Sequence, residues 1–240
     1  MDILSGKRAL VIGGTGGIGQ AVAAALAQSG AELFIHGGTS QERMSIALAA
    51  ARSFGVKAQG LLSRIDGNVE PFLEFCPEPD IVVAAHGPFL RKRLAETTTE
   101  DWRLITINNL AFPGALISAV LPGMTARKYG RILLFGGTDT GAIRGFSTTP
   151  AYSAAKTGLA VVARSVAQTA ACFGVTCNIV CPGLVDTEYA DAETKIYNRA
   201  KSPLGISLTP EIIAKTALHI LESPSLNGAI IQIDGGISLS

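Results

Sequence analysis

The stretch RALVIGGTGGIGQAVAAALAQSG, residues 8–30, decides the fold of this protein. A short apolar run passes through a glycine-rich turn into an alanine-rich run with helical spacing. Such a turn lets backbone N–H groups and a helix N-terminus approach a pyrophosphate without side chains in the way. Both spacings used by dinucleotide-binding proteins occur in it, GxGxxG at Gly14, Gly16 and Gly19 and GxxxGxG at Gly13, Gly17 and Gly19.

The alternation of apolar runs and alanine-rich segments continues to the end of the chain. Six further runs read as strands, with helices between them: AELFIH, VKAQGLL, DIVVAA, RILLFG, VTCNIVC and AIIQID. Strands that are apolar on both faces and alternate with helices are typical of a parallel sheet covered on both sides. We therefore expect an α/β fold, a doubly wound parallel seven-stranded sheet of the Rossmann type in three α/β/α layers. It should form a single domain over residues 1–240.

One segment departs from this pattern. Residues 184–208 are more polar and less periodic than the rest of the chain. Segments of this kind at the surface of an α/β domain commonly cover a binding site. We expect residues 184–208 to form a mobile flap over the substrate.

Composition limits the partners. Lysine and arginine number 20 and aspartate and glutamate 19, so the chain has no overall field that would attract nucleic acid or an anionic membrane. No apolar run approaches a membrane span, and the start lacks a signal-peptide layout. The four cysteines include no CxxC pair, so no metal site is expected, and Cys177 and Cys181 should be buried in a strand. These features favour a soluble, cytoplasmic protein.

The run AYSAAK, residues 151–156, places a phenol and an ammonium one helical turn apart. Tyr152 and Lys156 would share a helix face. By itself, such a pair occurs by chance in many helices. Three other motifs accompany it in a fixed order: GGTGGIG before it, and CPGLVDT (181–187) and IDGG (233–236) after it.

In these four motifs the chain resembles a single-domain short-chain dehydrogenase/reductase, from Lys7 to Gly236. The closest overall pattern is that of the 3-oxoacyl carrier-protein reductases. The resemblance implies an NAD(P)-dependent oxidoreductase that interconverts a carbonyl and a secondary alcohol by hydride transfer, with a 3-oxoacyl thioester as a candidate substrate. The segment DWRLITINNL fits the same family, and its spacing assigns the active-site asparagine to Asn109.

The resemblance also implies the residue roles. Tyr152 is expected to protonate the carbonyl oxygen as hydride arrives. A phenol has a pKa near 10, and Lys156 beside it would favour the phenolate and hold the nicotinamide ribose hydroxyls. Asn109 would hold a water that links Lys156 to solvent.

The third catalytic member departs from the family, which usually has a serine shortly before the tyrosine. Here Thr138 lies fourteen residues before Tyr152. A threonine hydroxyl has the same donor and acceptor capacity, so Thr138 is expected to polarise the substrate carbonyl. Ser147, in the loop just ahead of the tyrosine, is the alternative.

A second departure is AAHG, residues 84–87, where the family usually has NNAG. His86 either fills the polar gap that the alanines leave or lies near the nicotinamide ribose, and the first interpretation is favoured. The aspartate that commonly meets the adenine is replaced by Ser63 or Arg64, with Asp66 further on.

The end of the second strand bears on the cofactor. NAD enzymes of this type usually carry an acidic residue there, and this chain has Gly37. No carboxylate opposes a 2′-phosphate, so NADP is favoured and NAD is the alternative. Four residues are candidate 2′-phosphate donors: His36, Thr39, Ser40 and Arg43. The family's remaining cofactor contacts carry over to Gly13, Thr15, Gly16, Gly17, Ile18, Gly19, Gly87, Tyr152, Lys156, Pro182, Gly183, Val185 and Thr187.

Protein partners are suggested by charge and by the resemblance. The basic clusters at 91–93 and 126–128 read first as solvated faces. Placed near the active-site mouth, they could instead dock an acidic carrier protein that bears an acyl thioester. The resemblance further implies a homotetramer or homodimer built from the helices around 100–125 and 151–173.

A rival hypothesis is a dinucleotide-binding protein that no longer catalyses and instead reports cofactor state to a partner. The altered AAHG segment and Thr138 motivate it. The intact Tyr152, Lys156 and Asn109 argue against it, because a pure binder has no evident need for all three.

Overall fold

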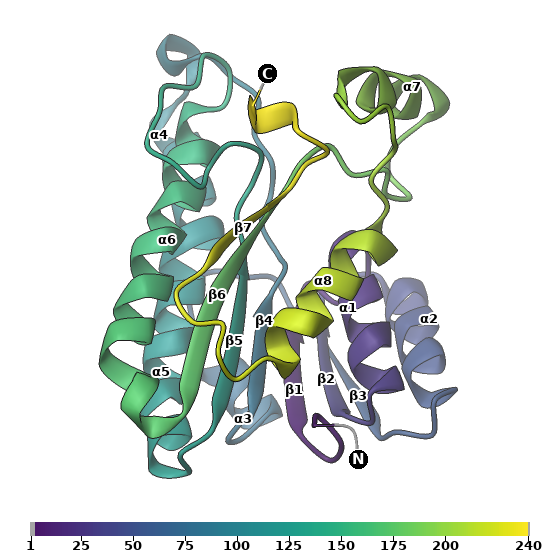
Figure 1. The fold of residues 1–240 in the computed structure, drawn as a ribbon, viewed down its shortest axis with the longest axis vertical. Coiled ribbons are helices and arrows are strands. Elements are labelled where there is room, and N and C mark those ends of the chain that lie inside the picture. Colours follow the sequence, from purple (N-terminus) through teal and green to yellow (C-terminus); the bar gives the residue numbers. More distant parts are fainter. Residues whose placement is uncertain (1–2, 240) are drawn as a thin grey trace.

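A seven-stranded parallel sheet forms the centre of the computed structural model, which describes residues 3–239 (Figure 1). The strand order is β3-β2-β1-β4-β5-β6-β7. The strands are β1 Arg8–Ile12, β2 Glu32–Gly37, β3 Ala58–Leu62, β4 Ile81–Ala84, β5 Gly130–Phe135, β6 Val175–Pro182 and β7 Ile230–Ile233. The predicted doubly wound fold is confirmed, and each predicted strand is found.

Helices cover both faces of this sheet. They are α1 Gly17–Gln28, α2 Gln41–Arg52, α3 Glu70–Phe75, α4 Thr99–Thr106, α5 Phe112–Ala126, α6 Pro150–Ala170, α7 Ala192–Lys201 and α8 Pro210–Glu222. Figure 1 shows α1, α2 and α8 on one side of the sheet and α5 and α6 on the other. Right-handed crossovers of this kind place the helices that follow a parallel strand against the sheet.

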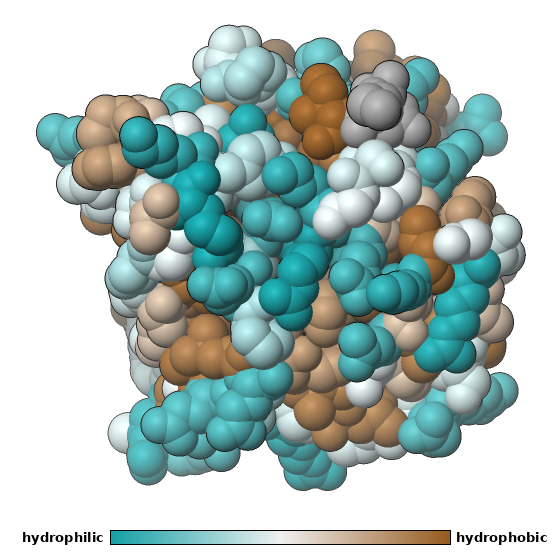
Figure 2. All heavy atoms as spheres, turned by 90° about the horizontal axis from the view of Figure 1, so that it is seen from below, coloured by the Kyte–Doolittle hydropathy of each residue, from teal (hydrophilic) through white to brown (hydrophobic). Residues whose placement is uncertain are grey.

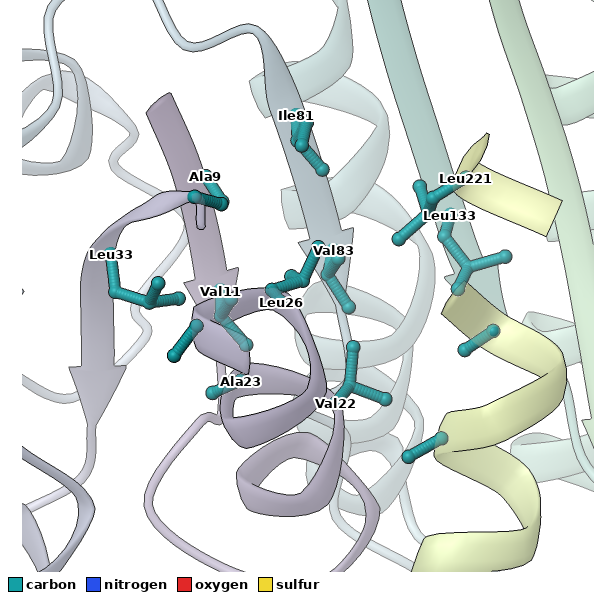
Figure 3. Close-up of a cluster of buried hydrophobic side chains, with 14 of the residues drawn as sticks. Ala9, Val11, Val22, Ala23, Leu26, Leu33, Ile81, Val83, Leu133 and Leu221 are labelled. Atoms are coloured by element: carbon teal, nitrogen blue, oxygen red, sulfur yellow. The ribbon is translucent and has the colours of Figure 1, made fainter. Parts of the chain in front are cut away.

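Alternate side chains of one strand enter different cores. In β1, Val11 packs with α1 and α8, whereas Leu10 packs under α5 and α6. Figure 3 shows the first core, where Val22 and Leu26 of α1 meet the sheet. Full burial of each such side chain contributes about 1.5–3 kcal/mol, which explains why the strands are apolar on both faces. Cys177 and Cys181 lie buried in β6, as predicted.

One helical run, residues 99–126, is the part of the described chain that is long and apolar enough to cross a membrane by length and composition. It comprises α4, a π-helical turn at Ile107–Ala111, and α5. Leu116 and Met124 of α5 are fully buried against the sheet. The run is therefore a core helix of the domain.

The two ends of the sheet differ in character. β1 has β2 on one side and β4 on the other, so the order in which strands are added to the sheet reverses at β1. In open α/β sheets a crevice forms at such a point, beyond the carboxyl ends of the strands. Figure 2 shows the opposite end from below, where hydrophilic side chains cover most of the surface between smaller apolar areas.

The basic cluster 126–128 lies at that opposite end, so its predicted place near the active-site mouth is wrong. Arg127 donates to the Pro79 carbonyl at 3.0 Å and lies 3.3 Å from the Glu78 carboxylate, just before β4 begins. The cluster therefore stabilises the turn at the amino ends of the strands.

The flap segment contains a helix that its weak periodicity did not indicate. Asp191 caps α7 by accepting from the Thr194 N–H at 2.8 Å. A bridge between Val185 and Leu208 joins the two ends of the segment. In Figure 1, α7 stands above α1 and α8, beyond the carboxyl ends of the strands.

Candidate active site

A cleft of about 390 Å³ opens where β1 and β4 end. Its size lies within the range of small-molecule sites, about 300–1,000 Å³. Four segments that are distant in sequence meet in it: the glycine loop, the residues after β2, the residues after β4 and Tyr189 of the segment after β6. The lining residues are Gly13, Thr15, Gly16, Gly38, Thr39, Ser40, Arg43, Ala85, His86, Gly87 and Tyr189.

The glycine loop has no room for side chains. Gly13 has φ +79°, and a Cβ there would lie 2.9 Å from the backbone nitrogen of His86. A Cβ on Gly19 would lie 2.1 Å from the Gly13 carbonyl oxygen. This close packing brings the backbone at the start of α1 to the edge of the cleft, and its N–H groups are a donor set that suits an anion such as a pyrophosphate.

Residue 37 is a glycine, and a side chain there would crowd Thr15. A Cβ on Gly37 would lie 2.5 Å from Cγ2 and 2.7 Å from Oγ1 of Thr15. Beyond it, Thr39, Ser40 and Arg43 line the cleft, and among the described lining residues of this segment none is acidic. The site offers hydroxyls and an exposed guanidinium where an adenosine ribose would lie.

His36 does not take part, and its predicted role as a phosphate donor is wrong. Its Nδ1 accepts from the Gly13 N–H at 3.3 Å, and its Nε2 donates to the Ser63 carbonyl at 3.0 Å. Burial lowers the pKa of His36 to about 4, so the ring is neutral. Both nitrogens are engaged, and the imidazole instead ties β2 to the glycine loop.

We expect this burial to make the fold acid-sensitive. The folded-state pKa lies below the ordinary value of 6.5, so stability is complete above pH 6.5 and falls as the pH drops toward 4. The contribution of His36 is about 3 kcal/mol. Thermal melts across this pH range should show that the melting temperature of His36→Gln falls less steeply with decreasing pH than that of the unaltered protein. His219→Gln is the control, because His219 is exposed on α8; equal slopes in all three proteins would contradict the assignment.

The segment after β6 reaches the glycine loop through one predicted residue. The nearest atom to a Cβ built on Gly17 is Cγ2 of Thr187, at 3.3 Å. Val185 and Ile18 are partly buried, and their side chains pack against the core. Gly183 donates to the Ile233 carbonyl at 2.9 Å and continues the line of β6 beyond Pro182.

Tyr152 and Lys156 share one face near the start of α6, as predicted. The Lys156 ammonium is buried, donates to the Phe135 carbonyl at 2.8 Å and lies 5.8 Å from the centroid of the Tyr152 ring. The Phe89 ring packs edge-on against Tyr152 with centroids 5.0 Å apart. The phenol is thus held between an aromatic ring and the end of β5.

Burial, and not the neighbouring cation, has the largest effect on the pKa of the Tyr152 phenol. It raises the pKa of Tyr152 to about 12 and lowers the pKa of Lys156 to about 8. The role predicted for Lys156, to favour the phenolate, stays a prediction. At neutral pH Tyr152 holds its proton, which is the form that a general acid requires.

Asn109 lies beside Lys156, on the far side of Gly87. Its amide group donates to the carbonyls of Pro88 and Ile105, both at 3.1 Å, while Oδ1 has no hydrogen-bond partner among the described residues. A Cβ on Gly87 would lie 2.1 Å from this oxygen and 3.0 Å from the Lys156 ammonium. The π-helical turn, which is common at functional sites, places this buried acceptor next to the cation.

The hydroxyl of Thr138 is engaged within the protein. It donates to the Pro182 carbonyl at 3.3 Å. The preceding residue, Gly137, faces the phenol: a Cβ there would lie 2.9 Å from Cε1 and 3.1 Å from the hydroxyl oxygen of Tyr152. Ser147 is exposed in the loop before α6. The role of Thr138 stays a prediction, and Gly137 is a neighbour of the phenol that sequence reasoning missed.

His86 makes a side-chain hydrogen bond and also lines the cleft, while its predicted place near the nicotinamide ribose stays a prediction. Its Nε2 lies 3.0 Å from Oδ1 of Asn108, and the ring lines the cleft. Burial lowers its pKa, so it is a neutral polar group. The hydrogen bond to Asn108 fills the gap left by the two alanines.

Comparisons with known proteins agree with this geometry. The family model described as enoyl-(acyl carrier protein) reductase matches residues 13–238. The 3-oxoacyl-(acyl-carrier-protein) reductase FabG of Haemophilus influenzae is 30% identical and covers 99% of the chain and 100% of its own length. A structure titled short chain dehydrogenase/reductase family protein superposes with a TM-score of 0.88 at 28% identity and covers 100% of both chains. A 3-oxoacyl (acyl-carrier-protein) reductase of Agrobacterium tumefaciens, solved with NADP bound, gives a TM-score of 0.88 at 27% identity and covers 97% of this chain and 94% of its own.

Proposed function

Since the chain belongs to the short-chain dehydrogenase/reductase family of NAD(P)-dependent oxidoreductases, we propose that it interconverts a carbonyl and a secondary alcohol with Tyr152 as acid and base. One observation carries the proposal. The half-buried Tyr152 shares a helix face with the buried Lys156, and Lys156 and the Asn109 oxygen lie beside Gly87, which lines the cleft.

In this proposal the bound nicotinamide supplies hydride to the carbonyl carbon. The neutral Tyr152 donates its proton to the carbonyl oxygen, and in the reverse direction the phenolate takes the proton from the alcohol. Lys156, anchored by the Phe135 carbonyl, stabilises the phenolate by charge. The free Oδ1 of Asn109 holds a water through which the proton is replaced, and Thr138 polarises the carbonyl.

We propose NADP as the cofactor because residue 37 is a glycine without a carboxylate and Arg43 offers a guanidinium. NADPH is expected to bind more tightly than NADH. Arg43→Ala should lower the ratio of the NADH and NADPH dissociation constants by about tenfold to a hundredfold, the effect of losing one hydrogen bond to a charged group. Fluorescence titration of both dinucleotides measures it.

The matched control is Arg103→Ala, an exposed arginine on α4. It should leave both affinities unchanged. Tighter binding of NADH by the unaltered protein would reverse the cofactor assignment.

For the substrate we propose a 3-oxoacyl thioester. A second hollow, of about 420 Å³, lies over the start of α6 and is lined by apolar residues that include Leu94, Ile143 and Phe146. Its size and apolar lining suit an acyl chain. Carrier-protein docking would then use the cluster 91–93, although Lys92 already pairs with Asp101 at 2.6 Å. A screen of carbonyl compounds tests the substrate class. It compares acyl thioesters, sugars and steroids and follows the absorbance of the nicotinamide.

The rival hypothesis, a catalytically inactive dinucleotide-binding protein, is favoured by one observation. The Thr138 hydroxyl is engaged with Pro182, and Gly137 brings no hydroxyl to the phenol. Tight NADPH binding without turnover of any carbonyl in the screen would favour the rival.

We also propose that the protein is cytoplasmic, that residues 184–208 act as the substrate flap, and that two or four chains associate through α5 and α6. Small side chains on these helices are exposed, among them Ala115, Ala119 and Ala154. Light scattering at several concentrations would show whether the chain stays monomeric.

A further inference from the structure

The N-terminus of α1 already has an anionic partner from a distant part of the chain. The Gly17 N–H donates to the Glu188 carboxylate, at 3.0 Å from Oε1 and 3.1 Å from Oε2. A Cβ built on Gly16 would lie 2.7 Å from the same Oε1. A carboxylate thus lies where the glycine loop offers its donors, and the helix dipole stabilises it there.

The next residue meets the other candidate anion site. The guanidinium of Arg43 lies 4.6 Å from the centroid of the Tyr189 ring and donates to the Tyr189 hydroxyl. That hydroxyl would lie 2.5 Å from a Cβ on Gly16, and the ring lines the cleft. Tyr189 therefore lies across the space between the glycine loop and the arginine proposed to bind the 2′-phosphate.

Two consecutive flap residues thus hold the two groups that an NADP molecule would need. The pyrophosphate requires the N–H groups at the start of α1, and the 2′-phosphate requires Arg43. A carboxylate and a pyrophosphate cannot share the same donors, and their like charges repel. Cofactor and flap must compete.

The flap is built so that this part can move. Its base is fixed by the Val185 to Leu208 bridge and by the Asp186 N–H, which donates to the Leu208 carbonyl at 2.8 Å. Beyond this base, residues 188–201 are mostly exposed, with Asn198 as a buried exception among the described residues. A segment with so few buried contacts opens at little cost in free energy.

We propose that Glu188 and Tyr189 are intramolecular competitors of the dinucleotide, and that Tyr189, through Arg43, is a determinant of the choice between NADP and NAD. Glu188 would weaken binding of both cofactors because both contain the pyrophosphate. The hydrogen bond between the Tyr189 hydroxyl and Arg43 would weaken binding of NADP alone, because it occupies the guanidinium proposed for the 2′-phosphate. The inference rests on the proposed function, since it takes the cleft to be the dinucleotide site.

The experiment compares dissociation constants of NADPH and NADH by equilibrium fluorescence. Glu188→Ala should bind both about threefold to tenfold more tightly, because the competent open state becomes more populated. Tyr189→Phe keeps the ring over Arg43 but removes the acceptor, so NADPH should tighten and NADH should stay unchanged. Glu193→Ala is the matched control, because Glu193 is an exposed acid of the same flap at the start of α7.

A second measurement needs no cofactor. Hydrogen exchange of the ligand-free protein should become faster in Glu188→Ala, both at residues 16–19 and over 184–208, and should stay unchanged in Glu193→Ala. Glu188→Gln, which keeps the shape and removes the charge, should give an intermediate result. It also replaces Glu188→Ala if that variant fails to fold.

The outcomes separate the two proposals. If the unaltered protein binds NADPH and Glu188→Ala binds both dinucleotides no more tightly, the competition is overturned and the proposed function stands. Unchanged exchange at residues 16–19 in Glu188→Ala overturns it as well. If neither dinucleotide binds any of these proteins, the cofactor site itself is wrong, and the competition is overturned with it.

Discussion

Tyr152→Phe is expected to lower turnover by about 10² to 10⁴, the usual contribution of a positioned general acid. The change removes the transferable proton and little else. The ring would still pack against Phe89, with centroids 5.0 Å apart in the present protein, and against the backbone of Gly137. Cofactor affinity should therefore be nearly unchanged. Steady-state turnover with the best substrate of the screen and a parallel NADPH titration measure the two quantities.

Tyr129→Phe is the control for this experiment. Tyr129 precedes β5 at the amino end of the sheet, and it does not line the cleft. The substitution removes the same phenolic hydroxyl as Tyr152→Phe. Its turnover should match that of the unaltered protein. An unaffected turnover number in Tyr152→Phe would sink the assignment of Tyr152 as the acid.

Thr138→Val should lower turnover by about 10² to 10³, the effect of losing one donor to a developing oxyanion. Valine keeps the branched shape and removes the hydroxyl, which now donates to the Pro182 carbonyl at 3.3 Å and must turn toward the substrate to act. Thr138→Ser should keep activity. Turnover numbers of both variants and of the unaltered protein, measured with saturating cofactor, test these two expectations.

Ser147→Ala tests the alternative assignment, because Ser147 carries the other hydroxyl considered for polarising the carbonyl. Normal turnover in Thr138→Val with loss in Ser147→Ala would move the role to Ser147. Normal turnover in both would leave the hydroxyl role without support. That result would agree with the bare Gly137 beside the phenol, which has no side chain to offer.

The two hydroxyl experiments and the Tyr152 experiment also test the rival, inactive protein. A binder that had lost catalysis would show tight NADPH binding and no turnover in the unaltered protein. It would then be insensitive to all three substitutions. Loss of turnover in Tyr152→Phe therefore supports an enzyme directly.

Local sequence determined the sheet and its glycine loop. An apolar run such as RILLF, buried along its whole length in β5, has only one stable environment, between two helical layers. Gly19 is set by a contact within one strand, turn and helix, because a Cβ there would lie 2.1 Å from the Gly13 carbonyl oxygen. Tyr152 and Lys156 are brought together by helix periodicity alone. Such features depend on neighbours in the chain, so a pattern predicts them.

Tertiary structure alone decided which groups are free to act. His36 carries a polar ring at the right place in sequence, yet contacts with Gly13 and Ser63 occupy both nitrogens. Likewise, burial set the pKa of Tyr152 to about 12 where charge alone argued for a lower value. Glu188 reaches Gly17 across a separation of 171 residues. Hydrogen-bond saturation, desolvation and the meeting of distant segments depend on the packed fold, and no local pattern of residues records them.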